Sequence, residues 1–123
     1  MFGLKEQHIE AIGQCFSNYQ CIDEVIIYGS RAKGNYKPGS DIDLTIVGNS
    51  ITGQELLRLE NELDDLLLPY KIDISLKDKI TNPDLIDHIN RVGRVFYTKP
   101  KALVVNEPAV KYEEKSTVQP RKE

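Results

Sequence analysis

The chain has 123 residues, of which 40% are hydrophobic and 28% are charged, and this composition is typical of one soluble globular domain. The longest purely apolar runs, such as Leu66 to Leu68, are far too short to span a bilayer, so we expect that the chain does not cross one. The formal net charge of −3 makes nucleic acid an unexpected partner, because proteins that bind polynucleotides usually carry a basic surface.

Hydrophobic periodicity predicts that the first half of the chain forms helix, strand, short helix and strand. Leu4 to Tyr19 carries apolar residues at helical spacing, with polar residues on the other side. Val25 to Tyr28 is short, apolar and β-branched, as in a strand that is covered on both faces. The polar segment from Ser30 can make about two helical turns before Pro38 stops it. Asp41 to Val47 then alternates polar and apolar residues, which predicts the second strand.

The second half of the chain is predicted to form helix, strand, helix and strand. The helix from Thr52 to Pro69 opens with a capping box, in which a threonine is followed three residues later by a glutamate. Lys71 to Leu76 alternates polar and apolar residues and forms the third predicted strand. Asn82 to Gly93 has proline at its first helical position and an apolar face, and Arg94 to Tyr97 can add a last short strand.

This order of elements predicts the fold class. We expect an α/β or α+β domain over residues 1–98, with a small mixed β-sheet and helices mainly on one face of it. Residues 99–123 contain three prolines among mixed charges. We expect them to form a C-terminal tail that is disordered or binds a partner.

The pattern that points to function is a pair of aspartates, Asp41 and Asp43, on a strand that otherwise looks buried. Residues two apart in a strand share a face, and Asp73 joins them if the third strand lies alongside. Carboxylates gathered in this way repel one another unless a cation compensates, and oxygen ligands favour Mg²⁺ or Mn²⁺. The alternative is that they are ordinary surface residues. Aspartate is a poor strand former, however, and a pair of them brings no local structural gain.

Gly29 and Ser30 lie at the predicted turn from the first strand to the short helix. A glycine permits close approach of the backbone there, and the free amides of a helix N-terminus attract an anion such as a phosphate. The alternative is a simple turn with Ser30 as the N-cap. A phosphate site after one strand and metal-binding carboxylates at the start of the next together suit a metal-bound nucleoside triphosphate.

Two familiar motifs are excluded by their spacing. Asn35 and Tyr36 stand where a phosphate-binding P-loop requires lysine and then serine or threonine. Ile46 and Thr52 stand where an EF-hand that starts at Asp41 requires glycine and glutamate. The short glycine-containing segment and the aspartates therefore belong to a different kind of site.

Together these residues resemble the minimal nucleotidyltransferases of the DNA polymerase β superfamily. Gly29 and Ser30, ten intervening residues, and then Asp41 and Asp43 match the GS and DxD signature of that family. Asp73 falls where the family carries a carboxylate on its third strand. The resemblance implies the polymerase-β-like nucleotidyltransferase fold and the transfer of AMP from ATP to a hydroxyl acceptor.

The resemblance also implies a role for each candidate residue. Asp41, Asp43 and Asp73 would bind Mg²⁺ or Mn²⁺ and carry the catalysis, with Asp73 as the general base. Arg31 or Lys33 could instead form a structural ion pair. The implied nucleotide-binding residues are Gly29, Ser30, Arg31, Lys33 and Ser40.

Small stand-alone members of this family resemble the antitoxin half of a toxin–antitoxin pair. The implied partner is a small helical HEPN ribonuclease, on which a tyrosine is adenylylated. ATP and such a HEPN-domain protein are therefore the expected partners, and a homodimer or a hetero-oligomer is the expected assembly. Two alternatives stay open: a non-catalytic antitoxin that neutralises its partner by binding it, and a nucleotidyltransferase that acts on a small molecule.

The remaining features add no chemistry to this prediction. The first ten residues lack the apolar segment of a secretory signal, so we expect a cytoplasmic protein. Cys15 and Cys21 have neither metal-ligand spacing nor a disulfide framework and are expected to be free thiols. His8 and His88 are expected to be plain surface residues on the first and last helices.

Overall fold

The computed structural model describes residues 1–100, and residues 101–123 lie outside the described part. The elements follow in the order α1 (Glu6–Ser17), β1 (Ile22–Tyr28), α2 (Ser30–Lys33), β2 (Ile42–Gly48), α3 (Gly53–Asp64), β3 (Ile72–Leu76), the 3₁₀ turn η1 (Lys77–Lys79), α4 (Pro83–Val92) and β4 (Arg94–Thr98). The predicted order of helices and strands is confirmed. The predicted tail, residues 99–123, lies almost wholly outside the described residues.

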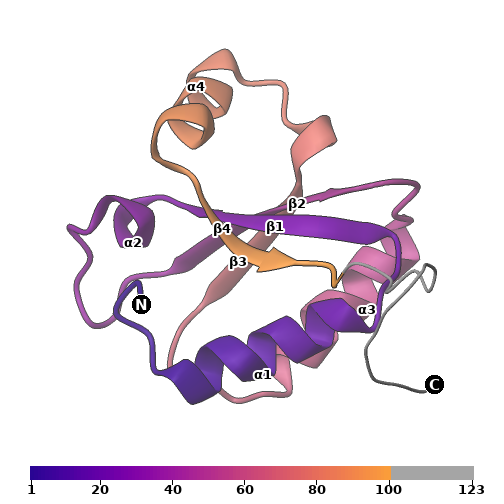
Figure 1. The fold of residues 1–123 in the computed structure, drawn as a ribbon, viewed down its shortest axis with the longest axis horizontal. Helices are drawn as coiled ribbons and strands as arrows, with labels where there is room; N and C mark the ends of the chain where they lie inside the picture. The colour runs from indigo at the N-terminus through magenta and orange to yellow at the C-terminus, as the bar shows by residue number, and fades with distance from the viewer. Residues whose placement is uncertain (101–123) are drawn as a thin grey trace, which may run out of the picture.

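The strands form one mixed sheet in the order β3-β2-β1-β4 (Figure 1). β1 pairs antiparallel with both β2 and β4, whereas β2 pairs parallel with β3. A parallel pair needs a long crossover, and α3 supplies it between β2 and β3. The predicted small mixed sheet is therefore confirmed, with β3 at one edge and β4 at the other.

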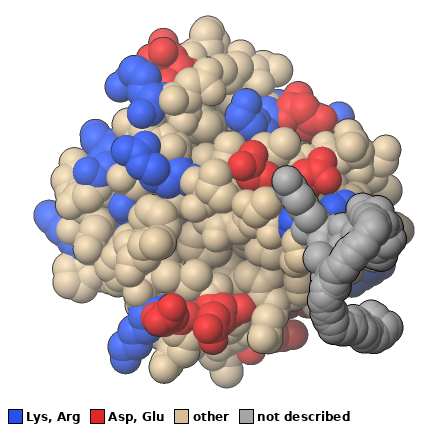
Figure 2. All heavy atoms as spheres, in the orientation of Figure 1, with Lys and Arg blue, Asp and Glu red and all other residues tan. Residues whose placement is uncertain are grey.

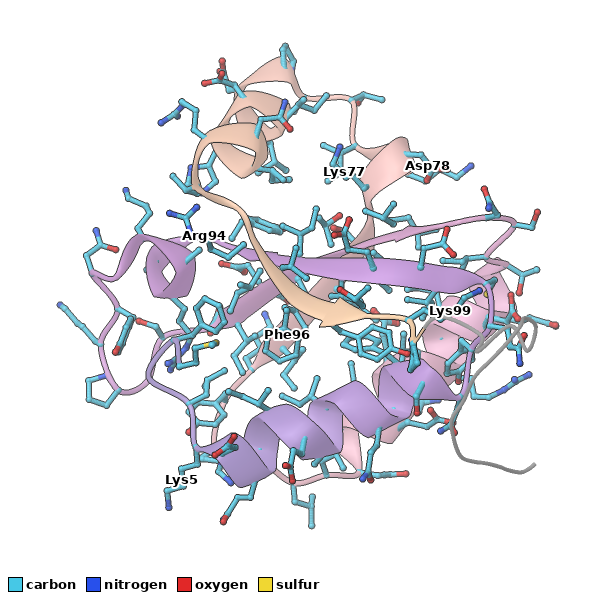
Figure 3. The ribbon with its side chains drawn as sticks, in the orientation of Figure 1. Lys5, Lys77, Asp78, Arg94, Phe96 and Lys99 are labelled. Atoms are coloured by element: carbon cyan, nitrogen blue, oxygen red, sulfur yellow. The ribbon has the colours of Figure 1, made fainter. Side chains whose placement is uncertain are left out.

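The core lies between the sheet and a layer formed by α1 and α3, which lie side by side below the strands in Figure 1. Alternate residues of β1 and β2 point into this layer and are almost fully buried. Each such aliphatic side chain contributes about 1.5–3 kcal/mol through burial. Phe96 of β4 also points towards α1 (Figure 3) and packs against the core. The central core residues are Ile12, Phe16, Val25, Ile27, Ile42, Leu44, Ile46, Leu59 and Leu63.

The opposite face of the sheet is covered only in part, by α4, which stands above the strands in Figure 1. Ile89 of α4 is 3% exposed. The backbone at Gly93 lies so close to Ile26 of β1 that a Cβ at this position would touch the isoleucine. The predicted arrangement, with helices mainly on one face, is confirmed, and the less covered face is the one that carries the aspartates.

The structure changes three predicted boundaries by more than two residues. β1 begins at Ile22 rather than Val25, because Ile22 already pairs with Gly48 at the end of β2. α2 has one turn rather than two, because Gly34 ends it in a left-handed conformation with φ of 91°. α3 ends at Asp64, short of the predicted proline, because Leu67 turns the chain with a φ of 54°.

Two smaller predictions are also tested within the described residues. No helix in residues 1–100 is long and apolar enough to cross a membrane. Cys15 and Cys21 are free thiols, as predicted. Burial raises the pKa of both thiols, so both favour the protonated, unreactive form.

Candidate active site

The three predicted carboxylates come together at the start of β2 and β3. Asp43 and Asp73 are direct neighbours in the parallel pairing of these strands. Adjacent strands lie about 4.7–4.9 Å apart, so the two side chains leave one face of the sheet at neighbouring positions. Asp41 is exposed and lies immediately before β2. Aspartates that are far apart in the sequence therefore share one patch.

Gly29 places the end of β1 against this patch. Its backbone has φ of 78° and ψ of −158°, a conformation that residues with a side chain rarely adopt. Tyr28, the preceding residue, is the register partner of Asp43. A Cβ at Gly29 would collide with the carboxylate of Asp43. Glycine is thus required both by the turn and by the close approach of the Asp43 carboxylate to the backbone.

The pKa of the Asp43 carboxyl group is raised above its usual value. The largest cause is burial, which removes water from the charged form. The negative charges of Asp73 and Asp41 raise this pKa further, and His88 opposes them. The site therefore concentrates more negative charge than its own residues neutralise, and a bound cation would relieve this repulsion.

The carboxylate oxygens of the three aspartates are the kind of ligand that a hard divalent cation prefers. Their side chains do not converge on one metal position in this structure. Among residues 1–100, no three His, Cys, Asp or Glu side chains form a group that could hold a metal ion. Asp73 Oδ1 lies 3.8 Å from Lys71 Nζ in an exposed ion pair. Asp41 and Asp73 are exposed, so movement of their side chains would not disturb the core. The metal-binding role of the three aspartates stays a prediction.

Arg31 lies inside the connection between β1 and β2, which is at odds with the nucleotide-binding role predicted for it. The residue is 2% exposed, and all three guanidinium nitrogens donate hydrogen bonds of 2.9–3.2 Å to backbone carbonyls. The guanidinium also lies over two aromatic rings, 4.9 and 5.3 Å from their centroids. Its partners are the carbonyls of Phe2, Pro38 and Ser40 and the rings of Tyr36 and Tyr70. Arg31 is therefore buried against the backbone and holds the loop in place.

The other predicted nucleotide-binding residues lie on the same connection. The Ser40 hydroxyl accepts a 2.8 Å hydrogen bond from the backbone N–H of Lys37, so Ser40 also shapes the loop. Ser30 begins α2, where no side chain caps the first backbone amides. Lys33 and Lys37 are exposed, and Figure 2 shows basic side chains gathered at the end of the molecule that carries α2. Ser30 and Lys33 are thus placed where an anion would meet positive charge.

His88 joins the site from α4, so its prediction as a plain surface residue is wrong. The backbone N–H of Gly29 donates a 3.2 Å hydrogen bond to His88 Nε2. The imidazole also meets the ring of Tyr28 edge-on, with 6.1 Å between the centroids. The sequence does carry a signal for this placement, because His88 follows Leu85 by three residues and precedes Val92 by four. It therefore shares the apolar face of α4.

Replacement of His88 by alanine should lower the free energy of unfolding by about 1–2 kcal/mol, because the half-buried Gly29 amide loses its acceptor. His88→Gln offers a carbonyl oxygen in place of Nε2 and should recover most of this loss. Urea denaturation of both variants measures the effect. The control is Asp87→Ala, which removes an exposed ion pair with Arg91 worth about 0.3–0.5 kcal/mol. Equal losses in the two alanine variants would contradict a role for His88 at the Gly29 turn.

Comparison with known families identifies the family of the chain. The family model described as "Polymerase beta, Nucleotidyltransferase" matches residues 10–102, which include every carboxylate and turn residue of the candidate site. No curated protein matches the chain. The family assignment therefore comes from the family model and not from an individual curated relative.

Solved structures with a similar fold include chains from toxin–antitoxin complexes. One is a toxin–antitoxin with AMP-PNP, with a TM-score of 0.59 and 18% identity over 78% of this chain and 75% of the other. A second is a tri-AMPylated Shewanella oneidensis HEPN toxin in complex with MNT antitoxin, with a TM-score of 0.58 and 13% identity over 78% and 74%. A third is the toxin–antitoxin MntA–HepT, with a TM-score of 0.56 and 13% identity over 77% and 74%. At these identities the likeness establishes the fold.

Proposed function

Since the chain belongs to the polymerase β nucleotidyltransferase family, we propose that it transfers AMP from ATP to a hydroxyl group of a partner protein. The proposed partner is a helical HEPN-domain toxin and the proposed acceptor is one of its tyrosines, so that the chain acts as the antitoxin of the pair. Support comes from similar folds in complexes of toxin with antitoxin, one with AMP-PNP and one with an AMPylated toxin. The reaction belongs in the cytoplasm, where ATP is supplied.

The observation that carries this proposal is the close packing of the Gly29 turn on the Asp43 carboxylate. A triphosphate held at the start of α2 would lie directly beside the strand that carries Asp43, with Asp73 next to it in register. Phosphate-binding amides and cation-binding carboxylates on adjacent strands are what a metal-bound nucleotide requires. Exposed Lys33 and Lys37 supply positive charge on the same side.

In the proposed reaction, the acceptor oxygen attacks the α-phosphorus of ATP. The bond from the α-phosphorus to the oxygen that bridges it to the β-phosphate breaks, and pyrophosphate leaves. Asp73 accepts the proton of the acceptor hydroxyl. Asp41, Asp43 and Asp73 would hold Mg²⁺ or Mn²⁺, which when bound neutralises phosphate charge and lowers the pKa of the attacking hydroxyl. The backbone amides from Ser30 onward and the Lys33 ammonium would hold the phosphates.

When the chain is produced together with its HEPN partner and ATP, the mass of the partner should increase by one or more AMP groups. Intact-protein mass spectrometry measures this change. Asp41→Ala should leave the mass of the partner unchanged, because the variant lacks one of the proposed cation ligands. An unchanged partner mass with the unaltered chain would contradict the proposed activity.

The same variant separates the two alternatives from the proposal. If Asp41→Ala still neutralises the toxin fully, then binding rather than catalysis protects the cell, as for a non-catalytic antitoxin. If the chain transfers AMP to a small hydroxyl compound without any protein present, it is a small-molecule nucleotidyltransferase. A loss of both mass change and protection would support the proposal.

A further inference from the structure

A pocket of about 460 Å³ is lined in part by Asp73, whereas Asp41 and Asp43 do not line it. Its walls come from α3, from the loop that follows it and from the first residues of β3. Ile72 and Asp73 both line it, although Ile72 packs against the core and Asp73 leaves the other face of the sheet. The pocket therefore lies at the outer edge of β3, next to the residue proposed as the general base.

The charge of this pocket disfavours the nucleotide. Glu60, Asp64 and Asp73 contribute three carboxylates, whereas Lys71 contributes one ammonium group, which pairs with Asp73. Glu60 and Asp64 are four residues apart on α3, where like charges cost about 0.2–0.5 kcal/mol. Neither has an ion-pair partner among residues 1–100. A triphosphate would be repelled by this lining, whereas a positively charged group would be attracted.

The shape of the pocket suits a polypeptide. β3 is an edge strand, and its outer side has no neighbouring strand within the described part of the chain. Leu57 lines the pocket although it is 58% exposed, and Leu67, in the loop of the same wall, is 88% exposed. Exposed leucines beside unpaired carboxylates offer contacts to a chain that carries both apolar and basic side chains.

One wall of the pocket is already ordered before any ligand binds. Tyr70 lines it, and its ring is held by the Arg31 guanidinium at 4.9 Å. On another side the ring meets His8 edge-on, with 5.7 Å between the centroids, so the prediction of His8 as a plain surface residue is wrong. A wall whose aromatic ring is held by the buried Arg31 and by His8 needs little ordering when a ligand binds.

We propose that this pocket is the docking site for the acceptor segment of the partner protein, and that it selects a segment with lysine or arginine next to the modified hydroxyl residue. The proposal rests on the proposed function, because it assigns the acceptor side of the same reaction. Glu60 and Asp64 bind the basic residues, Leu57 meets an apolar neighbour, and the hydroxyl group reaches Asp73 from the edge of the sheet.

Two fluorescent peptides test this docking site. Both contain a central tyrosine, which is flanked by lysines in one peptide and by glutamates in the other. With the 123-residue chain at moderate ionic strength, the lysine peptide should bind at least about tenfold more tightly than the glutamate peptide in fluorescence anisotropy. The double variant Glu60→Lys/Asp64→Lys should reverse this preference.

The matched control is Glu6→Lys/Glu10→Lys, which reverses two exposed charges at the same helical spacing on α1. It should bind both peptides as the unaltered chain does. Equal binding of the two peptides, or equal effects of the two double variants, would overturn the proposal. A separate assay with labelled ATP and Mg²⁺ follows transfer to the tyrosine. A peptide that docks as expected but is never labelled would count against the proposed function and leave the docking site in place.

Discussion

Asp43→Asn is expected to reduce the rate of AMP transfer by about a thousandfold, because an uncharged amide replaces a proposed cation ligand. A bound cation stabilises the transition state by several kcal/mol, and about 1.4 kcal/mol corresponds to a factor of ten in rate. The loss should appear in kcat, since the Gly29 turn, which is the proposed phosphate site, is unchanged. Transfer of labelled AMP to the partner protein measures it. Activity within tenfold of the unaltered chain would show that Asp43 is not a ligand.

The same substitution should stabilise the fold at neutral pH. The folded Asp43 binds its proton more tightly than the unfolded residue does, because its pKa is raised above the ordinary value of 3.8. The free energy of unfolding therefore falls as the pH rises from this ordinary value through the raised pKa. Asparagine does not ionise, so the variant should be the more stable protein at pH 7. The difference should vanish in acid, below the ordinary aspartate pKa.

Urea denaturation in EDTA across this pH range measures the gain without interference from cations. Asp41→Asn is the matched control, because Asp41 is exposed and also belongs to the proposed cation site. It should lose transfer activity as Asp43→Asn does, with a change in stability below about 0.5 kcal/mol. The same pH-dependent gain in both variants would show that burial of Asp43 is not its cause.

The largest loss of stability is expected for Arg31→Ala, at about 3–5 kcal/mol. The substitution leaves the carbonyls of Phe2, Pro38 and Ser40 without their buried donor. It also removes the cation that lies over Tyr36 and Tyr70. The shift in the urea midpoint measures the loss.

Arg31→Lys should recover only a small part of this stability, because one ammonium group cannot reach the three carbonyls that the planar guanidinium serves. Arg91→Ala is the control for loss of an arginine. Its partner Asp87 is exposed, so the cost should stay below about 1 kcal/mol. A loss of that small size for Arg31→Ala would show that the loop does not depend on the guanidinium.

The fold could be predicted where local chemistry decides it. The capping box of α3 forms as predicted, because the Thr52 hydroxyl accepts from the Glu55 amide and the Glu55 carboxylate accepts from the Thr52 amide, both at 3.0 Å. Asn82 likewise caps α4 ahead of Pro83. The length of α2 has a local signal in Gly34, which ends the helix in a left-handed conformation. What could not be predicted is how Arg31 draws the following loop inward, because that contact is tertiary and leaves no periodic signal.

The candidate site was also predictable only where local sequence patterns decide it. Strand alternation places Asp41 and Asp43 on one side, and the parallel register then adds Asp73. Nothing in the local pattern says that the Gly29 amide meets a histidine 59 residues further along the chain. Similarly, Arg31 in a polar segment looks like a ligand for phosphate, and only the packed structure shows that all three of its guanidinium nitrogens donate to backbone carbonyls.

The parallel pairing of β2 and β3 has a consequence for how sequences with this site can diverge. The loop between α3 and β3 can lengthen or shorten at exposed positions such as Leu67, although Tyr70 within it is held by Arg31. The register itself has no such freedom. If β3 slid by one residue, Ile72 or Ile74 would stand beside Asp43 and Asp73 would turn into the core. The number of residues between Asp43 and Asp73 can therefore vary among such sequences. Within β3, however, the aspartate must stay at the position that pairs with Asp43, because a shift by one residue would turn it to the other face of the sheet.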